Sequence, residues 1–169
     1  MTHIGLISDT HGFLDPQVFK HFADVDEIWH AGDIGSLALT DDLRSFKPLR
    51  AVYGNIDDAA VRRDLPEDNR FELEGFDIWI THIGGYPRHY NSRVRNILQV
   101  KAPNIFVCGH SHILKVMRDE DYKGMLCMNP GAAGIHGFHS VKTLLRFTLH
   151  NKKITDMEAI EMGKRGEIK

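Results

Sequence analysis

The chain has 169 residues, of which 42% are hydrophobic and 26% charged, and this composition predicts one compact domain over residues 1–169 rather than a disordered chain. It is well short of the roughly 250 residues of a (β/α)8 barrel, which excludes that scaffold. Lys and Arg number 21 against 23 Asp and Glu, and the formal net charge of −2 gives no electrostatic basis for binding duplex nucleic acid.

Two features of the sequence predict a cytoplasmic protein without membrane association. No apolar stretch approaches the roughly 18 residues of a membrane-spanning helix, and the N-terminus carries no basic, hydrophobic leader. Cys108 and Cys127 lie in apolar runs, away from any metal or redox spacing, and are expected to be buried thiols in a reducing compartment. A disulfide framework is excluded.

The first third of the chain predicts alternating strands and helices. Short apolar runs predict strands at residues 3–8, 27–31 and 49–53. Between them, Asp15 and Pro16 begin a short helix, and Ser36 caps a second one. The order is βαβαβ, with connections long enough for parallel strands.

The rest of the chain predicts mostly antiparallel strands with one further helix. The charged stretch 62–70 is expected to be a surface connection, followed by a hairpin over 71–80 and a helix over 91–100. Further strands are expected at residues 105–108, 113–117, 125–128, 141–149 and 154–160. A glycine-rich loop spans 129–137.

Five of the predicted strands end in side chains that can bind a metal ion: Asp9, His11, Asp33, Asn55, His82, His110 and His112. The carboxyl ends of strands in an open α/β sheet line the ligand crevice, so these side chains are expected to converge. Seven donors are too many for one tetrahedral ion and suit two ions that share a carboxylate. Asp33 is the natural bridge, because a carboxylate has two oxygens and a neutral imidazole offers one nitrogen.

The donor set also indicates the metal and the chemistry. Mixed oxygen and nitrogen donors without thiolate predict two divalent ions, with Mn²⁺ in use and Fe, Zn²⁺ or Ni²⁺ as alternatives. Two such ions beside Asp9 and Asp33 leave a net positive charge, which favours an anionic substrate. The hypothesis is that the pair lowers the pKa of a bridging water, whose hydroxide attacks phosphorus in line.

In order and spacing, these residues resemble the calcineurin-like metallophosphoesterase superfamily. The motifs are Asp9-x-His11, Gly32-Asp33, Gly54-Asn55-x-Asp57, His82 and Gly109-His110-x-His112. They span most of the chain, and the Gly-Asn-x-Asp form looks like compact bacterial and archaeal phosphodiesterases of the YfcE type. The segment 129–131 also resembles a family segment. The resemblance implies an α/β fold, a two-sheet β-sandwich flanked by helices known as the metallo-dependent phosphatase fold.

The resemblance further implies which side chains hold each ion. The first ion would be held by Asp9, His11, Asp33 and His112, and the second by Asp33, Asn55, His82 and His110. It implies a phosphodiesterase acting on a small phosphoester, in which Asp33 holds the bridging hydroxide.

Two departures from the family pattern bear on catalysis. Many members carry a histidine after the motif asparagine, thought to protonate the leaving group, but here the residue is Ile56. Compact relatives tend to carry Gly-His after their equivalent of His82, whereas this chain has Ile83 followed by two glycines. Without a dedicated acid, diesters with good leaving groups are expected to react more readily than unactivated monoesters. The candidates for a substitute acid are His136, His139 and His89.

Several further residues admit two interpretations. Substrate contacts are expected from Arg88, Gly131 and His136. The segment 88–93 either forms an anion-binding rim or begins a solvated helix. Asp57 either orients a metal ligand or caps a short helix near Asp58, and the capping role is favoured. His30 is expected to be a hydrogen-bonded core histidine.

Two alternatives to a phosphodiesterase stay open. One is a non-catalytic protein-binding scaffold, because a retromer subunit has a similar fold and is regarded as a recruiting module with a degraded metal site. The seven filled ligand positions argue against that alternative, and an exposed apolar patch over the pocket would favour it. The other is a phosphomonoesterase acting on a nucleotide or sugar phosphate. A homodimer through the strand-rich C-terminal half is a further expectation.

Overall fold

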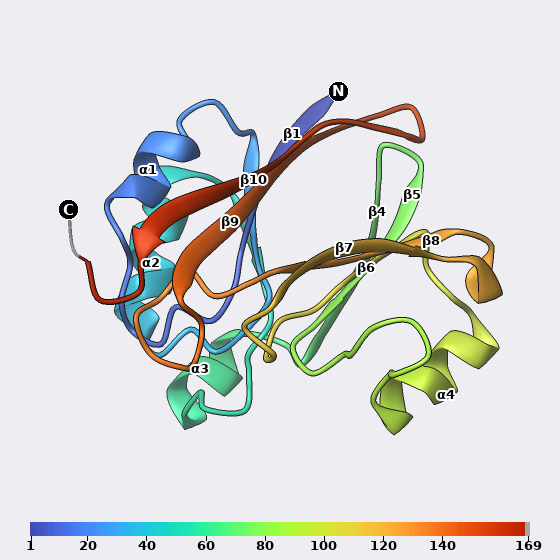
Figure 1. Ribbon diagram of the computed structural model, residues 1–169, viewed down its shortest axis with the longest axis horizontal. Helices are drawn as coiled ribbons and strands as arrows, with labels where there is room; N and C mark the ends of the chain where they lie inside the picture. The colour runs from blue at the N-terminus through green and yellow to red at the C-terminus, as the bar shows by residue number, and fades with distance from the viewer. Residues whose placement is uncertain (168–169) are drawn as a thin grey trace.

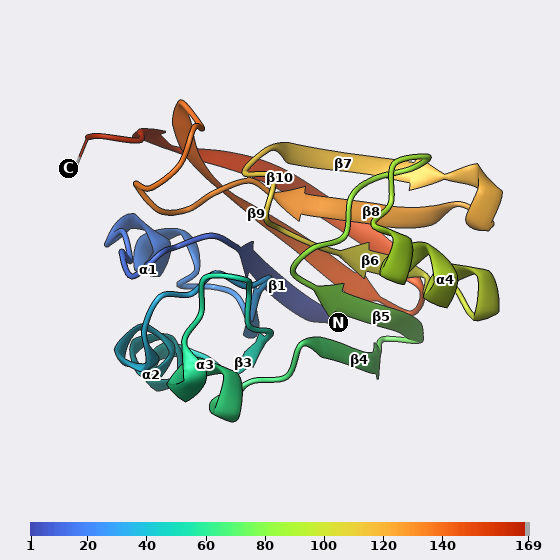
Figure 2. The same cartoon turned by 90° about the horizontal axis from the view of Figure 1, so that it is seen from below.

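Two mixed five-stranded sheets pack face to face in the computed structural model, which describes residues 1–167 (Figures 1 and 2). The first sheet contains β1 (Thr2–Ile7), β2 (Glu27–His30), β3 (Leu49–Ala51), β9 (Val141–His150) and β10 (Lys153–Lys164). The second contains β4 (Asp68–Leu73), β5 (Phe76–Thr81), β6 (Ile105–Val107), β7 (Leu114–Asp119) and β8 (Met125–Pro130). The predicted two-sheet sandwich of the α/β class is confirmed.

The helices lie on the outer faces of the two sheets. They are α1 (Gln17–His21), α2 (Leu37–Phe46), α3 (Ala59–Asp64) and α4 (Ser92–Val100), with a 3-10 turn η1 (Glu120–Tyr122). Figure 2 shows α1, α2 and α3 beside the first sheet and α4 beside the second. None of the helices within residues 1–167 has the length and apolar character needed to cross a bilayer.

Strand order explains why many loops meet at one edge. In the first sheet, order β10-β9-β1-β2-β3, the strands β1, β2 and β3 are parallel, as the βαβαβ prediction required. In the second, order β4-β5-β6-β8-β7, β8 pairs in parallel with β6 and antiparallel with β7. The expectation of mostly antiparallel strands after residue 113 is confirmed by β7 with β8, β9 with β10 and β9 with β1, and the β6–β8 pair is the parallel exception.

The core forms three layers because strand side chains alternate between the two faces of a sheet. Leu6 of β1 points between the sheets with Trp29 and Phe147, whereas Ile7 packs outward with helices α1 and α2. A third cluster joins α4 to the outer face of the second sheet. Gly5 is needed in β1, since a Cβ there would lie 2.7 Å from the ring of Phe22.

The stretch 62–70 is not the surface connection predicted from its charge. Its first residues belong to α3, which Asp58 caps by accepting the N–H of Val61, and its last residues belong to β4. A six-residue helix with one buried side chain, Val61, carries almost no hydrophobic periodicity. Strand β4 lies at a sheet edge, where alternate polar residues face solvent. The glycine-rich loop is also shorter than predicted, because Asn129 and Pro130 belong to β8.

Candidate metal centre

The seven predicted metal ligands come together where strands of both sheets end. Asp9 and His11 follow β1, Asp33 follows β2, Asn55 follows β3, His82 follows β5, and His110 and His112 follow β6. Two groups of side chains bring donor atoms within 4.8 Å of one another: Asp9, His11 and His112 in the first, and Asp33, His82 and His110 in the second. Both groups could hold a metal ion.

Asp33 and Asn55 connect these side chains. Oδ2 of Asp33 lies 3.4 Å from Nε2 of His11 and 3.2 Å from Nε2 of His82, so a single oxygen faces both groups. Its other oxygen, Oδ1, accepts the backbone N–H of Ile56 at 3.1 Å. The sequence had suggested a separate oxygen for each ion. Oδ1 of Asn55 lies 3.0 Å from Nε2 of His82 and 2.9 Å from Nδ1 of His110, which places Asn55 in the second group.

Unsatisfied buried atoms show that the first group fits a cation. Among residues 1–167, Oδ1 of Asp9 and Nε2 of His11 are buried without a hydrogen-bond partner. The two atoms face each other at 3.8 Å, beyond hydrogen-bonding distance. Leaving a buried carboxylate oxygen unpaired costs free energy, and a cation between the two atoms would satisfy both.

The second group fits a cation for a different reason. Nδ1 of His82 lies 2.7 Å from the carbonyl oxygen of Ala31, so it donates its proton there. Burial opposes protonation of this ring, but Asp33 and Asp9 outweigh burial and raise the pKa of His82, so Nε2 holds a proton towards the oxygens of Asn55 and Asp33 at 3.0 and 3.2 Å. A cation among these atoms would replace that proton, and the Ala31 carbonyl fixes the ring orientation that a metal ligand needs.

The carboxylates of the site are ionised. Burial raises the pKa of Asp9, but the imidazoles of His11, His112 and His82 outweigh burial and hold that pKa far below its usual range. Burial likewise opposes ionisation of Asp33, and its pKa is nevertheless lowered, chiefly by His82. In return Asp9 raises the pKa of His11. The paired negative charges attract cations.

The backbone at the site is strained. Five of the seven donors have positive φ angles: Asp9 (55°), His11 (47°), Asp33 (54°), His110 (71°) and His112 (61°). Such conformations cost about 1–3 kcal/mol each in residues other than glycine and occur mainly at functional sites. The motif glycines give the donors room, since a Cβ at Gly54 would lie 2.1 Å from Oδ1 of Asp33.

Asp57 holds two of the ligand loops together rather than capping a helix. Its carboxylate accepts the N–H groups of Ile34 and Gly35, at 3.1 and 2.8 Å, and that of Gly54 at 2.8 Å. These contacts join the loop after Asp33 to the loop before Asn55. The favoured capping role was wrong, because Asp58 caps α3.

The three candidate acids lie in different places. The ring centroid of His136 is 5.0 Å from that of His11, and His136 is exposed. Nε2 of His139 donates to the carbonyl of Gly134 at 2.7 Å, which leaves its Nδ1 to accept a proton from Nδ1 of His112 at 3.2 Å. Burial lowers the pKa of His139, in keeping with a neutral acceptor. His139 therefore orients His112, a role that the sequence did not reveal.

The donor groups found within residues 1–167 do not include His89, Arg88 or Gly131, although His89 lines a pocket beside His110. His89 packs against Tyr86, with ring centroids 4.7 Å apart. Arg88 is exposed in the same loop. Gly131 is buried, and a Cβ there would lie 2.2 Å from the hydroxyl of Thr143, so its position serves the turn after β8.

The segment 88–93 mixes the two interpretations. Arg93, in α4, donates to Asp68 at 2.9 Å and to Thr81 at 2.8 Å, so its guanidinium is already paired. Tyr90 donates to Asp119 at 2.6 Å.

His30 is fully buried with its ring nitrogens hydrogen-bonded to Thr10 and to the N–H of Gly32, as predicted.

The sequence model of the calcineurin-like phosphoesterase superfamily domain matches residues 2–152. The chain belongs to this superfamily. Its members act on phosphoesters and depend on metal ions, which agrees with the two donor groups. A probable metallophosphoesterase of Methanothermobacter thermautotrophicus is 32% identical over 134 residues, covering 76% of each chain. Another from Mycoplasma pneumoniae is 30% identical over 166 residues, covering 93% of this chain and 96% of the relative.

The fold of this chain is similar to that of solved structures that carry two different names, a phosphodiesterase and Vps29. A novel archaeal phosphodiesterase has a TM-score of 0.75 at 21% identity, covering 95% of this chain and 99% of its own. Vps29 from Entamoeba histolytica, complexed with Zn²⁺, has a TM-score of 0.71 at 17% identity, covering 97% of this chain and 99% of its own. At these identities the likeness shows the fold alone.

Proposed function

We propose that the protein is a binuclear metal-dependent phosphodiesterase. The observation that carries the proposal is the position of Asp33, whose Oδ2 faces His11 of the first group and His82 of the second. A carboxylate that faces both groups could serve two divalent ions, and two-metal phosphoryl chemistry uses such a pair of neighbouring sites. The ligand sets are those implied by the resemblance, with Asp33 common to both.

Different residues of the chain have different roles in such a reaction. Two divalent ions, when bound, supply the positive charge that activates a water for in-line attack on phosphorus and stabilises the transition state. Asp33 spaces the two groups, and the N–H of Ile56 holds its second oxygen. His82 and His112 keep fixed ring orientations through Ala31 and His139. We assign Mn²⁺ to the site, with Fe, Zn²⁺ or Ni²⁺ as alternatives.

The preference for diesters follows from the residue after Asn55. Ile56 contributes a backbone N–H but no side-chain acid, and its side chain is 45% exposed. Since His139 is engaged with Gly134 and His112, His136 is the remaining candidate acid beside the first group. An exposed imidazole is held less firmly in place than a side chain enclosed by the site, which favours esters whose leaving group departs as a stable anion without a positioned acid.

The test is hydrolysis of bis(4-nitrophenyl) phosphate beside 4-nitrophenyl phosphate, on metal-stripped protein with and without Mn²⁺. We expect Mn²⁺-dependent cleavage with the diester preferred, and a fall of at least about a hundredfold in Asp33→Asn. Asp41→Asn, an exposed carboxylate on α2, is the matched control and retains turnover. Preferential turnover of the monoester would replace the proposal with a phosphomonoesterase.

One observation favours the scaffold alternative. Edge strand β7 exposes Leu114, Val116 and Met117, an apolar surface that a partner chain could cover. If the metal-loaded protein hydrolyses neither ester, the scaffold becomes the better account. The buried thiols Cys108 and Cys127 support the proposed cytoplasmic location, since free thiols persist in reducing compartments. The homodimer stays a prediction.

A further inference from the structure

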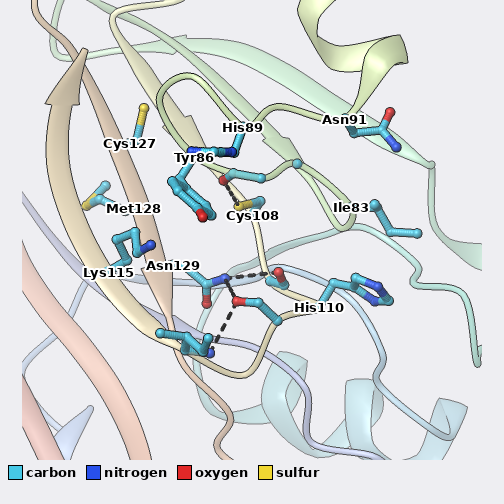
Figure 3. A pocket seen from close by; sticks show the side chains of 15 residues that line it. Ile83, Tyr86, His89, Asn91, Cys108, His110, Lys115, Cys127, Met128 and Asn129 are labelled. Atoms are coloured by element: carbon cyan, nitrogen blue, oxygen red, sulfur yellow. Dashed lines mark hydrogen bonds between the residues drawn. The ribbon is translucent and has the colours of Figure 1, made fainter.

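A pocket of about 260 Å³ opens beside His110, between the loop after β5 and strands of the second sheet (Figure 3). Its inner end is formed by Cys108 and Cys127, which are only 3% and 4% exposed. Tyr86 and Ile113, at 38% and 59% exposure, stand at its mouth. The pocket is thus deep, and its inner surface is apolar.

The lining carries one cation, Lys115, and two imidazoles, His89 and His110, and its other side chains are uncharged. Nζ of Lys115 lies 3.5 Å from the centroid of the Tyr86 ring, so the cation already rests on that ring. Burial raises the pKa of the Cys127 thiol to about 11, which keeps the inner end neutral. The charge of Lys115 lies against Tyr86 at the mouth, and an apolar inner end with an aromatic ring at the mouth suits a flat, uncharged ring.

The size of the pocket agrees with that chemistry. A cavity of roughly 150 Å³ is large enough for benzene. At about 260 Å³, this pocket has room for a larger ring, of the size of a heteroaromatic base.

The loop over the pocket depends on local features of this chain. A Cβ at Gly84 would lie 2.6 Å from Cβ of Cys108, so glycine lets the loop rest against the end of β6. Gly85 has a φ of 91°, which turns the loop so that Tyr86 reaches Lys115 of β7. Ile83 and the two glycines that follow it are therefore the residues that shape this wall.

The pocket is continuous with the candidate metal centre. It is lined by His110, a donor of the second group, and by Ile83, the residue after the donor His82. Asn129 donates to the carbonyl of Gly109 at 2.9 Å and to the hydroxyl of Ser111 at 3.1 Å, which holds the His110 loop in place (Figure 3). A group attached to phosphorus at the metal centre can extend into the pocket.

A second, polar pocket lies on the other side of Ile83. Its volume is about 480 Å³, and it is lined by Asn55, His82, Arg62 and Arg93. Ile83 lines both pockets and so separates an apolar space from a polar one beside the same donors. A phosphodiester with two unlike arms matches this arrangement.

We propose that the apolar pocket, which we call the aryl pocket (Ile83, Tyr86, Cys108, Ile113, Cys127 and Met128), binds an aromatic or heteroaromatic ring on one arm of the substrate. The substrate class is then phosphodiesters that carry such a ring, nucleobases included. This inference rests on the proposed function, because it assumes that phosphorus lies at the metal centre.

The test compares phenylphosphonate with methylphosphonate on Zn²⁺-loaded protein by calorimetry. The two ligands share a head group and a P–C bond that ester hydrolysis does not break, so only the ring differs. We expect phenylphosphonate to bind about tenfold more tightly, because the ring leaves water for an apolar pocket. Amide chemical shifts of Gly85 and Ser111 should change with phenylphosphonate and not with methylphosphonate.

Variants separate the pocket from general surface effects. Tyr86→Ala should reduce the tenfold preference to less than about threefold while methylphosphonate affinity is retained. Ile113→Ser is a second variant on the opposite wall, in case the loop rearranges. Met157→Ala, which removes a side chain of similar exposure (36%) on β10, should keep the full preference.

The outcomes for the aryl pocket and for the proposed function are distinguishable. Equal affinity of the two phosphonates, no binding of either, or a preference that survives both pocket variants overturns the aryl pocket even if diesters are hydrolysed. Protein that hydrolyses no ester but prefers phenylphosphonate through Tyr86 overturns the proposed function and leaves the ring-binding pocket standing.

Discussion

The two donor groups differ in how far the fold encloses them. In the first group, Asp9 is fully buried and the side chains of His11 and His112 are 12% and 14% exposed. In the second group, Asp33 and His82 are buried but His110 and Asn55 are exposed. Charges interact more strongly where water is excluded. The enclosed group is therefore expected to bind its ion more tightly, and the open group to exchange its ion with solvent and to face substrate.

The difference also shows how a site can be both rigid and reactive. The enclosed group contains the unpaired atoms of Asp9 and His11, so an ion bound there completes the fold. The open group lies between the two pockets, where ligands enter. One ion would serve mainly to hold the loops in place, and the other to receive the ester.

Among the substitutions that test the difference between the two groups, Asp9→Asn is expected to have the largest effect. It removes the buried carboxylate of the enclosed group, and we expect the affinity of the tighter ion to fall at least about a hundredfold. Zn²⁺ titration by calorimetry measures the two affinities separately. Asp41→Asn should bind both ions normally, and two unchanged affinities in Asp9→Asn would contradict the assignment of the enclosed group.

Asn55→Ala is the corresponding change in the open group. We expect the weaker ion to lose about thirtyfold in affinity, because a neutral amide oxygen contributes less than a carboxylate. The tighter ion should be unaffected. Asn69→Ala, on edge strand β4, is a matched control. A loss confined to the tighter ion would reverse the order of the two groups.

The sequence indicated where the candidate donors would meet because each of them lies in a loop that follows a strand. Asp33, for example, comes two residues after a buried apolar run, and parallel pairing of β1, β2 and β3 carries such positions to one edge. The two-sheet fold came from the same motifs through the resemblance. These features depend on which residues follow each other along the chain, and that can be read directly from the sequence.

The role of Asp57 could not be predicted in this way. Its partners Ile34 and Gly35 are backbone N–H groups more than twenty residues away, and a backbone donor has no signature in the sequence. The contact of His139 with His112 could not be predicted for a similar reason, since only the fold brings the two rings together. Helix α3 was missed because a single buried side chain, Val61, holds it.

A substitution of His139 tests the enclosed group with a smaller expected effect. In His139→Ala the ring of His112 loses its acceptor, and we expect the affinity of the tighter ion to fall about tenfold. His139→Gln, whose amide oxygen can accept the same proton, should recover part of the loss. A merely structural role would lower thermal stability and leave the ratio of the two ion affinities unchanged. The same experiment on His136→Ala, which lies beside His11 without a hydrogen bond to it, should leave both affinities intact.

The smallest effect concerns His30, which supports both groups equally. Its ring contacts the hydroxyl of Thr10, between Asp9 and His11, and the N–H of Gly32, next to Asp33. Burial lowers the pKa of His30 to about 4 from an unfolded value of 6.5. Between these pH values the unfolded chain binds the extra proton, so this stabilisation is present above pH 6.5 and is lost as the pH falls towards 4.

The slope from this one group reaches at most about 1.4 kcal/mol per pH unit. Urea unfolding of metal-free protein at several pH values measures it, and His30→Phe should remove it from the total. The hydrogen bonds that phenylalanine cannot make lower the stability of the variant equally at every pH, so the change of slope isolates the titration. Equal slopes in the two proteins would mean that folding does not lower the pKa of His30. Because His30 touches the loops of both groups, its protonation should weaken both ions by the same factor, whereas Asp9 and Asn55 act on one ion each.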